Sequence, residues 1–132
     1  MVVDTSAITA VLMNEPLARK LVTAMHAATS RLVSSVSVVE ATIMLESRKG
    51  PQGARNLDLF MYRMKLEVAS VNEQQIELAR IAWRRFGKGR HRAALNLGDC
   101  FSYALAKSRG FPLLFCGHGF RHTDITPALR DY

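Results

Sequence analysis

The chain has 132 residues, which suffices for one ordinary domain, and we interpret all of it as a single domain. Hydrophobic residues make up 48% and charged residues 22%, which excludes a disordered tail or a fibre. Lys and Arg number 18 against 11 Asp and Glu, and the resulting net charge of +7 suggests contact with a polyanion.

Neither an export signal nor a membrane span is expected, because apolar runs are short and are broken by charges or glycine. Two cysteines, Cys100 and Cys116, are too few for a disulfide framework. We interpret them as buried thiols in a reducing cytosol, and therefore expect a cytoplasmic protein without membrane contact.

Short apolar segments alternate with amphipathic ones along the chain. In chain order we predict a strand at 1–3, helices at 6–13 and 16–25, a strand at 31–34, helices at 35–48 and 52–65, a strand at 66–71, helices at 72–86 and 96–109, a strand at 112–115, and a further strand near Ile125. The helix at 35–48 is apolar on most sides, so we expect it to be buried. This alternation predicts a three-layer α/β/α domain with a short central parallel sheet of four to five strands.

Three carboxylates follow predicted strands or begin predicted helices: Asp4, Glu40 and Asp99. In an open α/β sheet the ligand crevice lies at the carboxyl ends of the strands, so the three would meet there. Each also has a structural interpretation. Asp4 is an acceptable N-cap, Ser37 to Glu40 fits a capping box, and Asp99 follows Asn96 as a first-turn acid.

Three carboxylates in one pocket would repel one another unless a cation lay between them. Oxygen ligands alone favour Mg²⁺, with Mn²⁺ as the alternative, over zinc. His118 and His122 form a single i,i+4 pair without the flanking ligands of a zinc motif, so a surface role is predicted for them.

A cationic segment runs from Arg80 to Arg92 without an acid. We interpret its later part as a patch that follows RNA phosphates, and the alternative is a solvated helix end. The predicted RNA-binding residues are Arg84, Arg85, Lys88, Arg90 and Arg92. Trp83 lies on the apolar side of its helix, where core packing is favoured over stacking on bases.

Three segments together resemble the PIN domain, and more closely VapC-type toxins of VapBC toxin–antitoxin systems. They are Val2–Ala7, Ser37–Ala41 and Leu97–Ala106, and the last is the most specific. The resemblance runs from Met1 to about Ile125. It implies a metal-dependent endoribonuclease that cleaves structured RNA such as transfer or ribosomal RNA.

In this family the acidic positions correspond to Asp4, Glu40 and Asp99, and a hydroxyl near the metal to Thr5 or Ser6. The resemblance assigns the metal to Asp4 and Asp99, and Glu40 would orient or deprotonate the attacking water. It also implies a homodimer and a VapB-like antitoxin partner. The segments 16–25 and 52–64 are either core or the groove for an antitoxin helix.

One departure concerns a fourth acid. Relatives usually have Gly-x-Asp-Phe after the fourth strand, whereas this chain has Gly117-His118-Gly119-Phe120, and Asp124 is the nearest remaining acid. We therefore expect weakened or lost activity, which Gly119→Asp would raise. Two alternatives stay open: a catalytically silent module that binds RNA or an antitoxin, and another metal phosphotransfer enzyme such as a DNA nuclease.

Overall fold

Four short parallel strands form the centre of the computed structural model, which describes residues 1–130. Their spatial order is β3 (Glu67–Ala69), β2 (Leu32–Ser34), β1 (Val2–Val3) and β4 (Leu113–Leu114). Val2 lies opposite both Leu32 and Leu113, so β1 is a central strand. All pairings are parallel, as the alternation of the sequence predicts.

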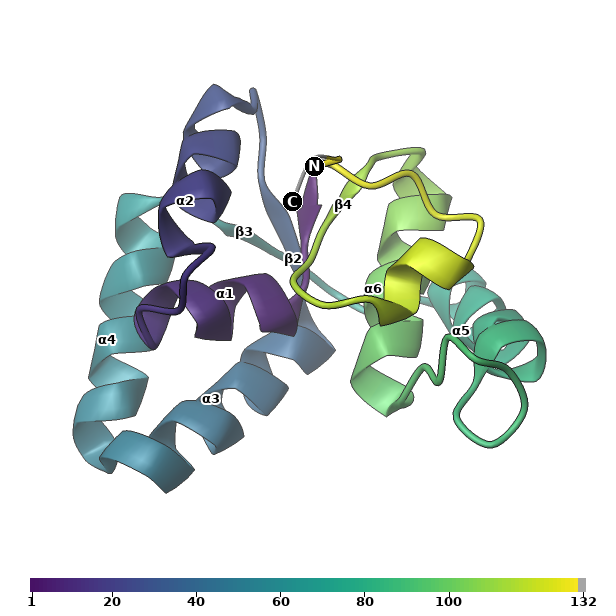
Figure 1. The fold of residues 1–132 in the computed structure, drawn as a ribbon, viewed down its shortest axis with the longest axis horizontal. Helices are drawn as coiled ribbons and strands as arrows, with labels where there is room; N and C mark the ends of the chain where they lie inside the picture. Colours follow the sequence, from purple (N-terminus) through teal and green to yellow (C-terminus); the bar gives the residue numbers. More distant parts are fainter. Residues whose placement is uncertain (131–132) are drawn as a thin grey trace.

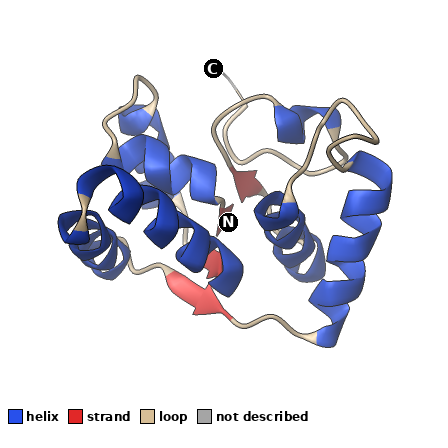
Figure 2. Ribbon diagram, turned by 90° about the horizontal axis from the view of Figure 1, so that it is seen from below, coloured by secondary structure: helices blue, strands red, loops and turns tan. Residues whose placement is uncertain are grey.

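Helices cover both faces of this sheet, as Figures 1 and 2 show. One face carries α1 (Thr5–Leu12), α2 (Ala18–Ala27), α3 (Ser35–Lys49) and α4 (Pro51–Arg63). The other carries α5 (Glu73–Phe86) and α6 (Leu97–Arg109). The three-layer prediction is confirmed.

The strands separate two hydrophobic clusters because successive side chains of a strand point to opposite faces. Val2, Leu32 and Leu113 belong to the cluster under α5 and α6. Val3, Val33 and Leu114 belong to the cluster under α1 to α4. Every one of these side chains is buried, so the alternation fixes the strand register.

Polar side chains begin three of the helices: α1 and α3, which directly follow strands, and α6, which follows α5. Asp4 caps α1 and Ser34 caps α3, each by accepting a hydrogen bond from a backbone N–H two residues on. Asn96 and Asp99 form a reciprocal capping box at the start of α6, and Gly110, with φ of 66°, ends that helix. The predicted capping box from Ser37 to Glu40 is wrong, because α3 begins earlier and Ser37 is buried within it.

Two further predictions need correction. Helix α3 is not enclosed: Val39 is 60% exposed and Ile43 61% exposed, because no other element of the described chain covers that side of the helix. The expected fifth strand near Ile125 is absent from residues 1–130, where Pro127 makes an isolated bridge to Leu113. A 3₁₀ turn, η1 (Gly119–His122), precedes it.

Residues 1–130 contain no helix with both the length and the apolar character needed to cross a bilayer.

Candidate active site

Asp4 is a buried carboxylate at the end of β1, with only 1% of its surface exposed. Its Oδ2 accepts hydrogen bonds from the backbone N–H and the hydroxyl of Ser6, at 3.0 and 2.7 Å. Its Oδ1 accepts from the Ser102 hydroxyl at 2.5 Å. These donors fix the carboxylate at the carboxyl end of β1. No described Lys, Arg or His forms an ion pair with it.

Asp99 comes from the first turn of α6. Its Oδ2 accepts from the Asn96 backbone N–H at 3.0 Å, which leaves Oδ1 without a hydrogen-bond donor among the described residues. Burial, followed by the charge of Asp4 and then that of Glu40, raises the pKa of Asp99 to about 7, although the Asn96 backbone hydrogen bond lowers it. Asp99 therefore caps α6 while one of its carboxylate oxygens has no hydrogen-bond donor within residues 1–130.

Glu40 comes from the second turn of α3 and is half-buried. Its carboxylate lies against Gly98, so closely that a Cβ on residue 98 would sit 2.6 Å from Glu40 Cδ. Only a residue without a side chain allows this approach. Gly98 directly precedes Asp99, so its lack of a side chain lets the Glu40 carboxylate lie against the start of α6.

A cleft of about 300 Å³ brings the three predicted acids together with a fourth, Glu15. The remaining walls are Thr5, Ser6, Thr9, Met44, Asn96, Cys116 and Gly117. No Lys, Arg or His of the described residues lines it. The cleft is thus strongly acidic in a chain whose net charge is +7.

Glu15 was missed by sequence reasoning, which used Asn14-Glu15-Pro16 only as the end of a helix. It lies in the connection between α1 and α2, which returns the chain to the cleft. Its charge, after burial, raises the pKa of the neighbouring Cys116. Cys116 is half-buried rather than buried as predicted, whereas Cys100 is buried; both are free thiols.

The donors of this cleft fit a hard divalent cation. Asp4 and Asp99 offer carboxylate oxygens, and the acids lack a cationic partner among the described residues. Within residues 1–130, no three His, Cys, Asp or Glu side chains are arranged to hold a metal alone. A pair of carboxylates suits Mg²⁺, which usually binds one or two and keeps several waters.

Gly119, where relatives usually have the fourth acid, was expected to lie at the site. Gly119 begins η1 and does not line the cleft, and a Cβ there would lie 2.8 Å from the Ala93 carbonyl oxygen. A side chain at this position would therefore require a shift of backbone, so Gly119→Asp carries a structural cost that sequence alone did not indicate.

Asp124 serves the packing of α6 instead of the cleft. It accepts a hydrogen bond from the Tyr103 hydroxyl at 2.7 Å and pairs with Lys107 at 3.2 Å and Arg85 at 3.5 Å. Burial raises the pKa of Asp124, but these hydrogen bonds and positive charges outweigh burial and lower it. His118 and His122 are exposed, in agreement with the predicted surface role.

The five predicted RNA-binding cations are all exposed, and their side chains make different contacts. Arg85 turns towards Asp124. Arg84 and Lys88 line a second cavity of about 580 Å³ that shares Asn96 with the acidic cleft. Arg90 donates to the Arg84 carbonyl at 3.2 Å, and Arg92 extends from the same loop.

Trp83 contradicts its prediction. It is 47% exposed and lines the second cavity instead of packing into the core. The apolar side of α5 is wider than the strip that α6 covers. The sequence pattern therefore does not tell which apolar residues of α5 pack into the core and which stay exposed.

Comparison with known proteins assigns the chain to a family. The family model for the PIN domain matches residues 1–125. The chain belongs to the PIN-domain family. Within it, the chain is similar to VapC ribonucleases.

Ribonuclease VapC30 of Mycobacterium tuberculosis is 50% identical to this PIN domain over 125 residues, which cover 95% of each chain. Ribonuclease VapC of Mycolicibacterium smegmatis is 51% identical over 125 residues, covering 95% of this chain and 97% of the relative. The crystal structure of M. tuberculosis VapC20, a sarcin-ricin loop cleaving toxin, has the same fold: the TM-score is 0.77 at 16% identity, over 98% of both chains. The resemblance stated from sequence is confirmed.

Proposed function

We propose that this PIN domain is the toxin of a type II toxin–antitoxin pair and that its acidic cleft hydrolyses phosphodiester bonds of structured RNA. The observation that carries the proposal is the convergence of Asp4, Glu15, Glu40 and Asp99 on one cleft without a cationic side chain among the described residues. The VapC ribonucleases at about half identity support the reaction class. Glu15 brings a fourth acid to the cleft, which favours the active enzyme over the silent alternative.

Asp4 and Asp99 would hold Mg²⁺, or Mn²⁺ as the alternative. A bound ion of this kind polarises a phosphoryl oxygen and lowers the pKa of water. Glu40 accepts the proton of the attacking water, because its carboxylate has no hydrogen bond from the described protein and faces the same cleft. Ser6 and Ser102 keep Asp4 in one orientation throughout, since their hydroxyls donate to its two oxygens.

Arg84 and Lys88 would hold RNA phosphates nearest the cleft, because their cavity meets it at Asn96. Arg85, Arg90 and Arg92 extend this cationic side of the molecule. Phosphate contacts of this kind release counterions, so the affinity for RNA should fall steeply with salt. Transfer and ribosomal RNA are the proposed targets, and the proposed location is the cytoplasm, where these RNAs act.

A VapB-like antitoxin would bind on the face of the sheet that carries α1 to α4, opposite to the face covered by α5 and α6. A groove of about 490 Å³ lies between α1, α2 and α4, with Val22, Leu59 and Phe60 in its walls. An amphipathic antitoxin helix would insert its apolar face there. Leu59→Asp should abolish inhibition by the antitoxin and leave cleavage intact, because Leu59 lies outside the acidic cleft.

A homodimer is also proposed, through the uncovered side of α3. Val39 and Ile43 are more than half exposed, and apolar side chains this exposed on one helix favour burial against a second copy. Sedimentation should show a dimer for the wild type and a monomer for Ile43→Lys.

The test of the activity uses purified, antitoxin-free protein with transfer RNA, ribosomal RNA and DNA of matched length. We expect cleavage of RNA at discrete sites with Mg²⁺ or Mn²⁺ and none in EDTA. Asp99→Asn should be inactive, while Asp58→Asn, which removes the same charge from the exposed side of α4, should be active. Equal activity of Asp99→Asn and the wild type would overturn the proposal, and preferred cleavage of DNA would favour the DNA nuclease.

A further inference from the structure

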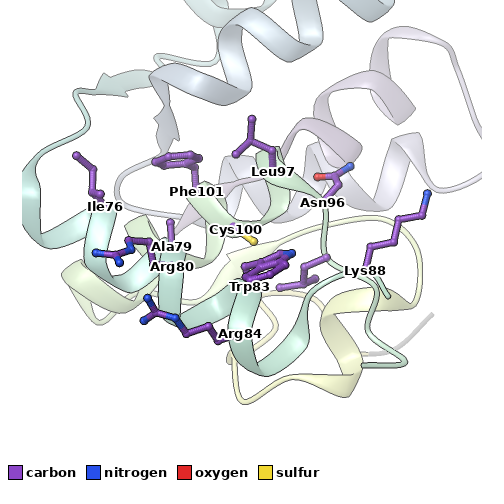
Figure 3. A pocket seen from close by; sticks show the side chains of 11 residues that line it. Ile76, Ala79, Arg80, Trp83, Arg84, Lys88, Asn96, Leu97, Cys100 and Phe101 are labelled. Carbon is purple, nitrogen blue, oxygen red and sulfur yellow. The ribbon is translucent and has the colours of Figure 1, made fainter. Parts of the chain in front are cut away.

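The second cavity has the chemistry of a nucleotide site. Its apolar wall comes from Ile76, Trp83, Leu97 and Phe101, and its cationic edge from Arg84 and Lys88 (Figure 3). In this view the Trp83 ring lies between the Arg84 and Lys88 side chains. The volume of about 580 Å³ falls within the range of cavities that enclose small organic molecules, about 300–1,000 Å³.

Trp83 is held in place although it is half exposed. The indole lies so close to Gly87 that a Cβ at that position would come within 2.8 Å of Trp83 Nε1. The Arg90 guanidinium lies over the ring, 4.6 Å from its centroid, but Arg90 does not line the cavity. The ring is therefore fixed from outside the cavity and presents its remaining surface to the cavity.

The charges at the cavity edge favour a polyanion as the occupant. Arg84 and Lys88 form no ion pair within residues 1–130, whereas Arg80, beside them, pairs with Glu77 at 2.8 Å. A second copy of this chain, packed here about a twofold axis, would bring the same cations face to face. An apolar wall with free cations around it instead fits a base and its flanking phosphates.

We propose that this cavity receives an unpaired RNA base next to the phosphate that the acidic cleft would cleave, with Trp83 as the stacking surface. The proposal rests on the proposed ribonuclease function and specifies its substrate. Asn96 lines both spaces, so the cavity adjoins the cleft at this residue, and a base bound in the cavity would lie beside the bound phosphate. Bases held in a duplex cannot enter, and the site therefore selects single-stranded loops or splayed nucleotides.

Trp83 is the single tryptophan of the chain, so its fluorescence reports directly on the cavity. The experiment titrates the Asp99→Asn variant in EDTA, so that no RNA is cleaved. The probes are a single-stranded RNA hexamer, a duplex of the same sequence, and an abasic hexamer with the same number of phosphates. We expect saturable quenching by the single strand, little by the duplex, and none by the abasic strand.

Matched variants separate stacking from charge. Fluorescence anisotropy of a labelled hexamer should show roughly 5- to 150-fold weaker binding for Trp83→Ala, the usual effect of removing a stacking aromatic. Trp83→Phe should retain most of the affinity, and Tyr62→Ala, which removes an aromatic that is 82% exposed on α4, should not change it. Arg84→Gln should reduce the salt dependence, while Arg19→Gln, an exposed cation on α2, should not.

Three outcomes would overturn the base site. The first is binding of the hexamer by anisotropy without quenching of Trp83. The second is equal quenching by single strand, duplex and abasic strand. The third is a change in Trp83 emission that follows protein concentration without RNA and parallels dimer formation, which would assign the cavity to a second copy. None of these bears on cleavage by the wild-type protein, so the ribonuclease assay fails or succeeds separately.

Discussion

Ser102 and Asp4 are 98 positions apart in the chain, yet the Ser102 hydroxyl donates to Asp4 Oδ1 over 2.5 Å. The same hydroxyl contacts that of Ser37 at 3.2 Å. Ser37 lies three residues before Glu40 and Ser102 three residues after Asp99, so each serine shares a helix face with one acid. The buried hydroxyls therefore fix α3, α6 and the end of β1 relative to one another, and with them the three acids.

Ser102→Ala should weaken both stability and activity. It leaves Asp4 Oδ1 without its buried donor, which costs about 1–3 kcal/mol in the free energy of unfolding, and it frees the carboxylate to turn. We expect cleavage to fall roughly 10- to 100-fold, the usual effect of removing a group that orients a metal ligand. Urea unfolding and initial cleavage rates measure the two effects. Ser108→Ala, whose hydroxyl donates to the Leu105 carbonyl on the same helix, is the control and should keep its activity.

Gly98→Ala should affect activity much more than stability. The new methyl group would displace the Glu40 carboxylate, which is the mobile end of a long side chain and can move without disturbing the core. We expect about 100-fold slower cleavage, because a displacement of about 1 Å at a reacting group can cost that much. Cleavage rate and melting temperature are compared with those of Glu40→Ala and the double variant. If Gly98→Ala slowed a Glu40→Ala enzyme as strongly as the wild type, the effect would not pass through Glu40.

Gly119→Asp should destabilise the protein without raising its activity. A Cβ at this position lies 2.8 Å from the Ala93 carbonyl, so backbone must shift, at a cost of about 1–3 kcal/mol. Thermal unfolding and cleavage rate are the measurements. A gain in cleavage with unchanged stability would show that the η1 segment moves to bring residue 119 into the cleft.

The effect of metal should depend on pH through Asp99. Because the pKa of this carboxyl is raised to about 7, it is mostly protonated at pH 6 and mostly ionised at pH 8 in the absence of metal. A cation binds the ionised form, so the rise in melting temperature caused by Mg²⁺ or Mn²⁺ should be larger at pH 8. The same rise at both pH values, or in Asp99→Asn, would contradict a metal site at Asp99.

Without metal, the contribution of Asp99 to stability should change with pH in the opposite direction and decrease as the pH rises. An unfolded aspartate ionises near its ordinary value of 3.8, whereas folded Asp99 keeps its proton until about pH 7. The contribution of Asp99 therefore favours the folded state at low pH and is lost as pH rises from about 4 to 7. Comparing urea unfolding of the wild type and Asp99→Asn in EDTA at several pH values isolates this contribution.

Asp124→Asn should lower stability near neutral pH. It weakens the hydrogen bond from the buried Tyr103 hydroxyl and removes two ion pairs, which are half exposed and add little. We expect a loss of about 1 kcal/mol. Because the pKa of Asp124 is lowered in the fold, its contribution is present above the unfolded pKa and is lost as pH falls through the folded value. Urea unfolding at neutral and acid pH should therefore show the difference shrinking in acid.

Much of the fold follows from local sequence. The caps at Asp4, Asn72 and Asn96 act within three residues of themselves, so each of their helices begins within one residue of its predicted start. Asp4 and Asp99 were predicted from a similarly local pattern, because acids at helix starts can face the same end of the sheet.

What the sequence did not reveal depends on contacts between distant segments. An apolar pattern on α3 does not say which side lacks a covering helix, and the exposure of Val39 and Ile43 reverses that prediction. Glu15 lines the cleft because the connection between α1 and α2 passes beside it. Ser102 contacts Asp4 because α6 packs on β1. No periodicity of the sequence encodes either approach.

Strand β1 is two residues long, and its two side chains belong to different hydrophobic clusters. A slip of one position in its pairing would exchange Val2 and Val3 between the clusters and withdraw Asp4 from the cleft. Hydrolytic competence is therefore conditional on native packing at this strand. A misfolded or nascent chain would therefore not cleave RNA, and cleavage would begin only when folding is complete.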